Sequence, residues 1–180
     1  MKPNAYTDFL TDPDQVTRRA ELQAFFGPNA ARFLPVYDGL HQDAVAGTGR
    51  PRFRLGGGGF SVPAFLFGPV WFLYRKMWAI AAIVVIGMIA IGLIPGAGNA
   101  GLPIGILLGL LARRVYVQQA IATLQKMRRP DGTIDPAEIR RAGGGSKVAG
   151  WISGLIYGAP VIAALAPMIL LIQAGEPIPR

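Results

Sequence analysis

The chain of 180 residues has no cysteine and a single histidine. These counts exclude disulfides, thiolate metal sites, cysteine nucleophiles and any metal site with two histidines. Apolar residues make up 52% of the chain and charged residues 16%, where a soluble domain has about 25% charged residues. Together with a net charge of +8, this composition favours a membrane protein and an all-α fold of membrane-spanning helices.

The N-terminal region, residues 1–59, predicts two short cytoplasmic helices and a linker. The first helix covers Asp12 to Phe26 and is closed by Gly27-Pro28. The second, whose start is limited by Pro35, carries apolar residues at i, i+3, i+4 and i+7: Phe33, Val36, Tyr37 and Leu40. A linker of residues 44–59, which contains glycine and arginine, follows.

Residues 60–76 predict an amphipathic or re-entrant helix at the membrane interface. Aromatic side chains recur on one helical face, at Phe67, Trp71, Tyr74 and Trp78. Tryptophan and tyrosine are typical of the headgroup region, and the basic pair Arg75-Lys76 lies beside them. The uncharged run 55–74 is also long enough to span a bilayer, so both placements stay open.

Residues 77–112 contain no charge and predict a transmembrane hairpin. A single helix of this length would reach about 54 Å, whereas the hydrocarbon core is about 30 Å thick. Glycine, proline and asparagine interrupt the run at residues 95–103. We therefore expect one helix over 77–94, an uncharged turn, and a second helix that starts near Pro103 and runs into the cytoplasm to about Arg129.

The remainder of the chain predicts a cytoplasmic helical segment, 113–147, a third transmembrane helix, 148–175, and a tail, 176–180. In the cytoplasmic segment, Asp135-Pro-Ala-Glu138 forms a capping box at the start of a short helix. That helix should end at the loop Gly143-Gly-Gly-Ser146. The third span carries no charge from 148 to 175, which is enough length to cross the bilayer.

Lysine and arginine predict the orientation of this arrangement. Nine of the 18 precede the first predicted span and eight lie between the second and third. Because basic residues concentrate in cytoplasmic segments, the N-terminus should be cytoplasmic and the C-terminus periplasmic. Trp78 and Trp151 then both lie at the cytoplasmic interface.

Small residues at every fourth position predict close helix packing in two of the spans. They are Gly101, Gly105 and Gly109 in the second span, and Gly150, Gly154 and Gly158 in the third. Such faces allow helices to approach closely in lipid. The contacts predicted here are within the chain or with a partner.

A second group of residues predicts contact with the lipid interface and its anionic headgroups. It consists of Phe67, Trp71, Tyr74, Arg75, Lys76, Trp78, Arg113, Arg114 and Trp151. The same basic residues are accounted for by membrane orientation, so no nucleic-acid partner is expected.

The segment Phe60-Ser-Val-Pro-Ala-Phe-Leu-Phe-Gly-Pro-Val-Trp-Phe-Leu-Tyr-Arg-Lys-Met77 resembles the signature of a bacterial membrane family, domain of unknown function 2628. Arg114-Val-Tyr116 resembles that family's Asn-Arg-Leu-Tyr, with Arg113 in the place of the asparagine. Gly144-Gly-Ser146 is similar to its Gly-Gly-Thr-Ser loop, and Phe25-Phe-Gly27 and Tyr37 also fit. The resemblance implies a small protein of the bacterial inner membrane and supplies no catalytic residues.

The predicted spans contain no Asp, Glu, Lys or His, which argues against a pump, an ion-coupled carrier or membrane-embedded acid–base catalysis. We therefore expect a non-enzymatic accessory or interaction subunit of an inner-membrane complex, with no cofactor and no metal. Its partners would be other membrane subunits or itself, together with membrane lipids. A small oligomeric channel or transporter is the first alternative, and an enzyme that acts on lipid headgroups is the second.

Overall fold

The computed structural model describes residues 5–46, 58–146, 148, 150 and 151, and every regular element among them is a helix. This confirms the all-α prediction for the part of the chain described. The α-helices are α1 (Ala5–Leu10), α2 (Gln15–Phe26), α3 (Ala30–Val45), α4 (Val62–Phe67), α5 (Pro69–Tyr74), α6 (Trp78–Gly92), α7 (Gly101–Met127) and α8 (Pro136–Ala142). Two 3-10 turns, η1 (Gly27–Asn29) and η2 (Ala97–Ala100), precede α3 and α7.

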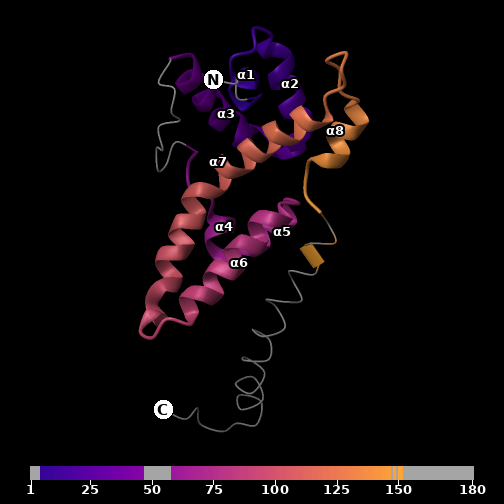
Figure 1. Cartoon of the computed structure of the whole chain (residues 1–180). Helices are drawn as coiled ribbons and strands as arrows, with labels where there is room; N and C mark the ends of the chain where they lie inside the picture. The colour runs from indigo at the N-terminus through magenta and orange to yellow at the C-terminus, as the bar shows by residue number, and fades with distance from the viewer. Residues whose placement is uncertain (1–4, 47–57, 147, 149, 152–180) are drawn as a thin grey trace, which may run out of the picture.

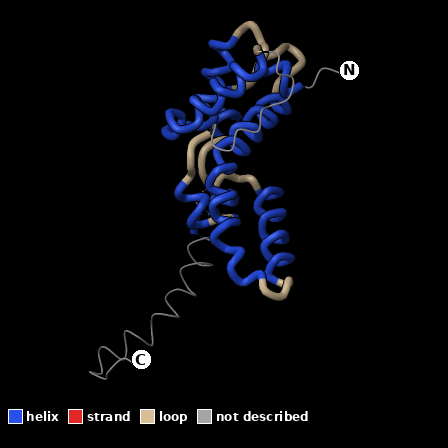
Figure 2. Tube along the Cα trace, turned by 90° about the vertical axis from the view of Figure 1, so that its left-hand side faces the viewer, coloured by secondary structure: helices blue, strands red, loops and turns tan. Residues whose placement is uncertain are grey.

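The long helix α7 joins two regions of the molecule (Figure 1). At one end, α1, α2, α3 and α8 pack around the C-terminal half of α7, and we call this region the head. At the other end, α6, the turn through η2 and the first half of α7 form the hairpin, residues 78–112. Figure 2 shows the two regions end to end, with the turn of the hairpin at the pole opposite the head.

The core of the head is apolar and rich in aromatic side chains. The spacing of Val117, Ala120, Ile121, Leu124 and Met127 predicts an apolar stripe on the cytoplasmic extension of the second span. The first four are fully buried in the head, and Met127 is half-buried. The predicted cap of α8 is also confirmed, because Asp135 accepts a hydrogen bond from the N–H of Ala137 at 2.7 Å. The loop Gly143-Gly-Gly-Ser146 follows that helix as predicted.

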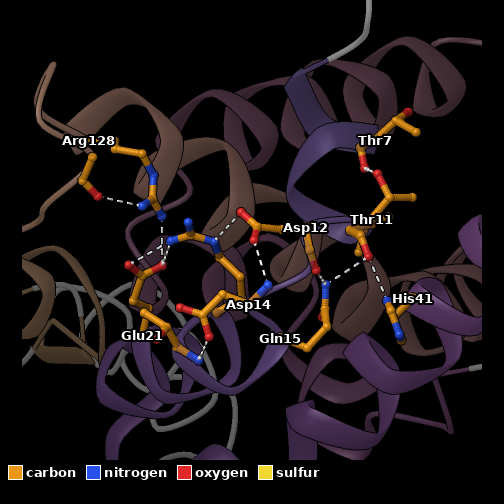
Figure 3. A network of polar contacts seen from close by, with 12 residues as sticks. Thr7, Thr11, Asp12, Asp14, Gln15, Glu21, His41 and Arg128 are labelled. Carbon is orange, nitrogen blue, oxygen red and sulfur yellow. Dashed lines mark hydrogen bonds and ion pairs between the residues drawn. The ribbon is translucent and has the colours of Figure 1, made fainter.

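A chain of ion pairs links α2 to the end of α7 (Figure 3). Arg18 pairs with Asp12 at 2.8 Å and with Glu21 at 3.0 Å, and Arg128 reaches the other oxygen of Glu21 at 2.8 Å. The N–H of Asp14 and the Arg18 guanidinium lower the pKa of Asp12. These contacts fasten the N-terminal helices to the residue that follows α7.

A second polar cluster in the head lies between α1, α2 and α3. The Tyr37 hydroxyl donates to Gln15 Oε1 at 2.5 Å, and burial raises the pKa of Tyr37 to about 12. His41 stands in a polar stretch of the sequence near Asp38 and Asp43, which predicts a solvated surface side chain. In the structure it is half-buried, and its Nδ1 lies 2.6 Å from the carbonyl oxygen of Leu10 (Figure 3). The ring of His41 therefore helps to close α1 onto α3.

One predicted helix start is wrong. Pro35 lies inside α3, which begins five residues earlier at Ala30. The turn η1 runs directly into α3, so the first turns of that helix are already set before the proline is reached. Pro35 then costs only one hydrogen bond, the one its missing N–H would have made to Ala31.

Two helices joined by a turn occupy the predicted hairpin, whereas its crossing of a membrane stays a prediction. The break at residues 95–103 corresponds to a turn through η2, with Gly96 in the left-handed region at φ +86°. Of the described helices, only α7 is long and apolar enough to cross a membrane, and α6, with 15 residues, is shorter. The third predicted span, except for residues 148, 150 and 151, lies outside the described residues, so the set of three spans stays a prediction.

The single interfacial helix expected over residues 60–76 is instead two short helices, α4 and α5, that meet at Gly68. Gly68 has φ +47°, a conformation that favours glycine, and Pro69 begins the second helix. The turn between them changes the helical phase. Trp71 is consequently buried at 7% exposure, while Phe67 and Trp78 are exposed.

Candidate functional site

The chain changes direction between α5 and α6, and residues Tyr74–Met77 form the elbow between the head and the hairpin (Figure 1). Arg75, in this elbow, is buried at 9% exposure. Lys76 has φ +61° and is the one non-glycine residue with positive φ among the residues described. Such backbone conformations cost about 1–3 kcal/mol and persist only where the surroundings enforce them. The elbow is therefore the unusual part of the fold.

Four aromatic rings enclose the Arg75 guanidinium. Its central carbon lies 5.0 Å from the ring centroids of Phe33 and Tyr116, and within 6 Å of those of Trp71 and Tyr74. These rings come from α3, α5 and α7, so one side chain connects three elements. A cation over an aromatic face gains about 0.5–2 kcal/mol, with the larger values at desolvated sites. We call this group the aromatic cage.

No carboxylate balances the charge of Arg75 among the described residues, whose ion pairs involve other arginines. The buried Nε and Nη1 of Arg75 have no hydrogen-bond partner there, and neither does the buried hydroxyl of Tyr116. Buried polar groups without partners cost about 1–3 kcal/mol each, and more when they are charged. Three unsatisfied polar atoms thus gather on two residues in contact.

Lys76 fastens the elbow to α8. Its Nζ donates to the carbonyl oxygens of Arg141 at 2.7 Å and Gly143 at 3.0 Å, at the end of that helix. The last carbonyls of a helix have no partner within the helix and carry partial negative charge, so an ammonium group suits this position. The hydrogen bonds of the Lys76 side chain to the end of α8 thus help to hold its backbone in the left-handed conformation.

The loop of residues 143–146 packs tightly against the elbow and against the end of α2. The N–H of Gly144 donates to the carbonyl of Phe25 at 2.9 Å, and the N–H of Ser146 donates to that of Tyr74 at 2.8 Å. A Cβ at Gly143 would lie 2.0 Å from the Phe25 oxygen, and one at Gly145 would lie 2.3 Å from the Tyr74 ring. Gly143 requires glycine because the obstructing atoms belong to the backbone, whereas a side chain at Gly145 would displace the Tyr74 ring.

The short motifs that support the family resemblance meet at this elbow. The Tyr116 ring packs at a tilt against Phe25 and Phe26 and edge-on against Phe33, with ring centroids 6.2, 5.4 and 4.8 Å apart. The elbow and the loop 143–146 complete the group. The sequence did not predict that these four segments meet, because tens of residues separate them and no repeating pattern connects one segment with another.

The predicted packing glycines have different surroundings in the structure. A Cβ at Gly105 would lie 3.2 Å from Phe65, and one at Gly109 would lie 2.6 Å from the Phe60 ring, so both accommodate the segment around α4. Nothing lies within 4 Å of the corresponding point at Gly101. Gly150 lies in ordinary contact with the Tyr74 ring at 3.6 Å. Gly154 and Gly158 lie outside the described residues.

The predicted lipid-contacting residues are also divided by the structure. Exposed side chains, which remain available to lipid, are those of Phe67, Tyr74, Trp78 and Trp151. Those of Trp71, Arg75 and Arg114 are buried. The remaining two basic residues contact backbone carbonyls, Lys76 at the end of α8 and Arg113 at Gly58 with a distance of 3.3 Å.

The comparison with protein families bears on the same region. Residues 38–121 match the model of the family described as "Protein of unknown function (DUF2628)". The similarity to this family that was expected from the sequence is thereby confirmed over residues 38–121, and the bacterial and membrane setting stays a prediction. The DUF2628 match spans α4 to α6, the elbow, and the part of α7 that carries Arg114 and Tyr116. No curated protein and no solved structure matches the chain.

The chemistry available at the elbow is that of a cation with free hydrogen-bond donors. Within the described residues, no three Asp, Glu or His side chains lie together where they could hold a metal ion. The exposed ring of the cage, Tyr74, separates Arg75 from solvent. The arrangement is suited to binding a negatively charged oxygen and to fixing the angle between head and hairpin.

Proposed function

We propose that this protein is a non-enzymatic accessory subunit of a bacterial inner-membrane complex, anchored by its hairpin and carrying the head in the cytoplasm. The observation that supports this most is the exposed apolar surface of the hairpin. Ile83 on α6 is 68% exposed, and Leu93, which directly follows α6, is 78% exposed; Ile86 and Ile89 between them are also exposed. In water, a continuous apolar surface of this kind would be covered by a partner or by lipid.

The hairpin has the composition expected of a segment in lipid. The helix α6 is apolar on all sides, and residues 77–112 carry no charge. At 1.5 Å per residue, the 15 residues of α6 reach about 22 Å, which is less than the thickness of a hydrocarbon core, about 30 Å. Local thinning of the bilayer and the adjoining apolar turn residues make up the difference.

The distribution of basic residues supports a cytoplasmic head. All basic residues of the described chain lie in the head or at its junction with the hairpin, and the turn at η2 has none. The positive-inside rule then puts the turn in the periplasm.

The accessory role follows from the surfaces that remain open to a partner. Gly105 and Gly109 are occupied by aromatic side chains of the same chain, whereas the position at Gly101 is open. A helix of another membrane subunit, or of a second copy, can approach closely there. A channel, the alternative, would require a homo-oligomer, since the described helices are too few to enclose a pore.

A pull-down in mild detergent from the native membrane, followed by native mass determination, tests this role. We expect a defined hetero-complex, and we expect Gly101→Leu to reduce co-purification of the partner at least about fivefold by blocking helix approach. Gly39→Leu is the matched control, because Gly39 has equally open surroundings but lies on α3 of the head. A pure homo-oligomer would favour the channel, and a bare monomer would contradict the proposal.

A further inference from the structure

The three unsatisfied polar atoms at the elbow lie deep in the protein and share one location. They are Nε and Nη1 of Arg75 and the hydroxyl of Tyr116, with the two residues 9% and 1% exposed. The guanidinium carbon lies 5.0 Å from the Tyr116 ring centroid. A buried charge is normally paired, and the buried Nε and Nη1 donors of Arg75, which have no acceptor among the described residues, indicate an occupant.

We propose that Arg75 and Tyr116 bind one phosphate group, presented by an anionic phospholipid headgroup or as free phosphate. The planar guanidinium presents its N–H groups in a fork that matches the oxygens of phosphate. A phosphodiester carries a single negative charge, which balances the charge of Arg75. The Tyr116 hydroxyl supplies a further hydrogen bond to the same group.

The surroundings of Arg75 give the ligand a direction of approach. Phe33, Trp71 and Tyr116 are buried walls of the aromatic cage, whereas Tyr74 is 39% exposed. A phosphate therefore reaches Arg75 past the Tyr74 ring, which has to turn aside. Trp78, also exposed, begins α6 four residues later. If the hairpin is inserted as proposed above, this side of the cage lies at headgroup depth, so the lipid source rests on the proposed function and the free-phosphate source does not.

Binding measurements on the full chain in lipid-free detergent test the site with two probes, dioctanoyl phosphatidylglycerol and inorganic phosphate. We expect saturable binding of a probe to the wild-type protein. Arg75→Met, which removes the charge and keeps an unbranched side chain, should weaken binding at least about tenfold. Tyr116→Phe, which removes only the hydroxyl, should weaken it about fivefold. Lys126→Met, an exposed charge loss at the far end of α7, should leave binding unchanged.

The outcomes separate the two sources. Arg75-dependent binding of the lipid without competition by inorganic phosphate assigns the site to a headgroup. Arg75-dependent binding of inorganic phosphate assigns it to the free anion, whether or not the hairpin is in a membrane. If Arg75→Met and Tyr116→Phe bind both probes as Lys126→Met does, or if the wild type binds neither, the proposal is overturned. If Arg75→Met does not fold, the comparison of Tyr116→Phe with the wild type is sufficient to test the proposal.

Discussion

Gly143→Ala is expected to lower the thermal unfolding midpoint of the detergent-solubilised protein by about 10 °C, corresponding to about 3 kcal/mol. The new methyl carbon would lie 2.0 Å from the carbonyl oxygen of Phe25, and 2.7 Å from its carbonyl carbon. These are backbone atoms and cannot turn aside as a side chain could. The Phe25 oxygen is also held by the N–H of Gly144 at 2.9 Å, so relief of the clash breaks that hydrogen bond.

Gly39→Ala is the matched control for this substitution. Gly39 lies inside α3, and nothing lies within 4 Å of the point where its Cβ would be. Alanine is favoured over glycine in a helix by about 1 kcal/mol, so the midpoint should rise by a few degrees. A change of less than about 2 °C for Gly143→Ala would show that the loop 143–146 does not hold the elbow as described.

Arg75→Ala is expected to cost about 3 kcal/mol, because it empties the space between four aromatic rings. Arg75→Met, measured without lipid, should stay within about 1 kcal/mol of the wild type, because an apolar side chain of similar length fills the cage and no buried charge is left unpaired. The difference between the two variants separates packing from charge. Thermal unfolding in lipid-free detergent measures both.

Arg19→Ala provides the control for loss of an arginine. Arg19 pairs with Asp38 on the surface of the head, with both side chains well exposed, and such pairs contribute less than about 1 kcal/mol. If Arg75→Met destabilised the protein as much as Arg75→Ala, the guanidinium would be paired by a group outside the described residues. The aromatic cage would then be one part of a larger ion-pair site.

The hairpin was predictable because its signals are local. The uncharged run has a Gly- and Pro-rich interruption at residues 95–103, and the observed helices end and begin within a few residues of it. The buried stripe at Val117 and Ile121 follows from helical periodicity in the same way. Capping by Asp135 is equally local, since the acceptor and the donor are two residues apart.

The elbow was not predictable by the same reasoning. The aromatic residues at 67, 71, 74 and 78 have helical spacing, and this pattern indicated one interfacial face. The break at Gly68 changes the phase, so Trp71 faces the head and Phe67 does not. Arg75 is buried because residues from α3 and α7 enclose it, and contacts over such sequence distances leave no periodic signal in a single chain.

Cysteine labelling tests the membrane orientation of the hairpin most directly. The natural chain has no cysteine, so single substitutions report without background. Asn99→Cys lies at the exposed turn of the hairpin, and Val16→Cys replaces a residue of the head that is 83% exposed. With a membrane-impermeant maleimide added to spheroplasts, we predict labelling of Asn99→Cys in intact spheroplasts and of Val16→Cys only after permeabilisation. Labelling of both positions on the same side of the membrane would contradict a hairpin that crosses it.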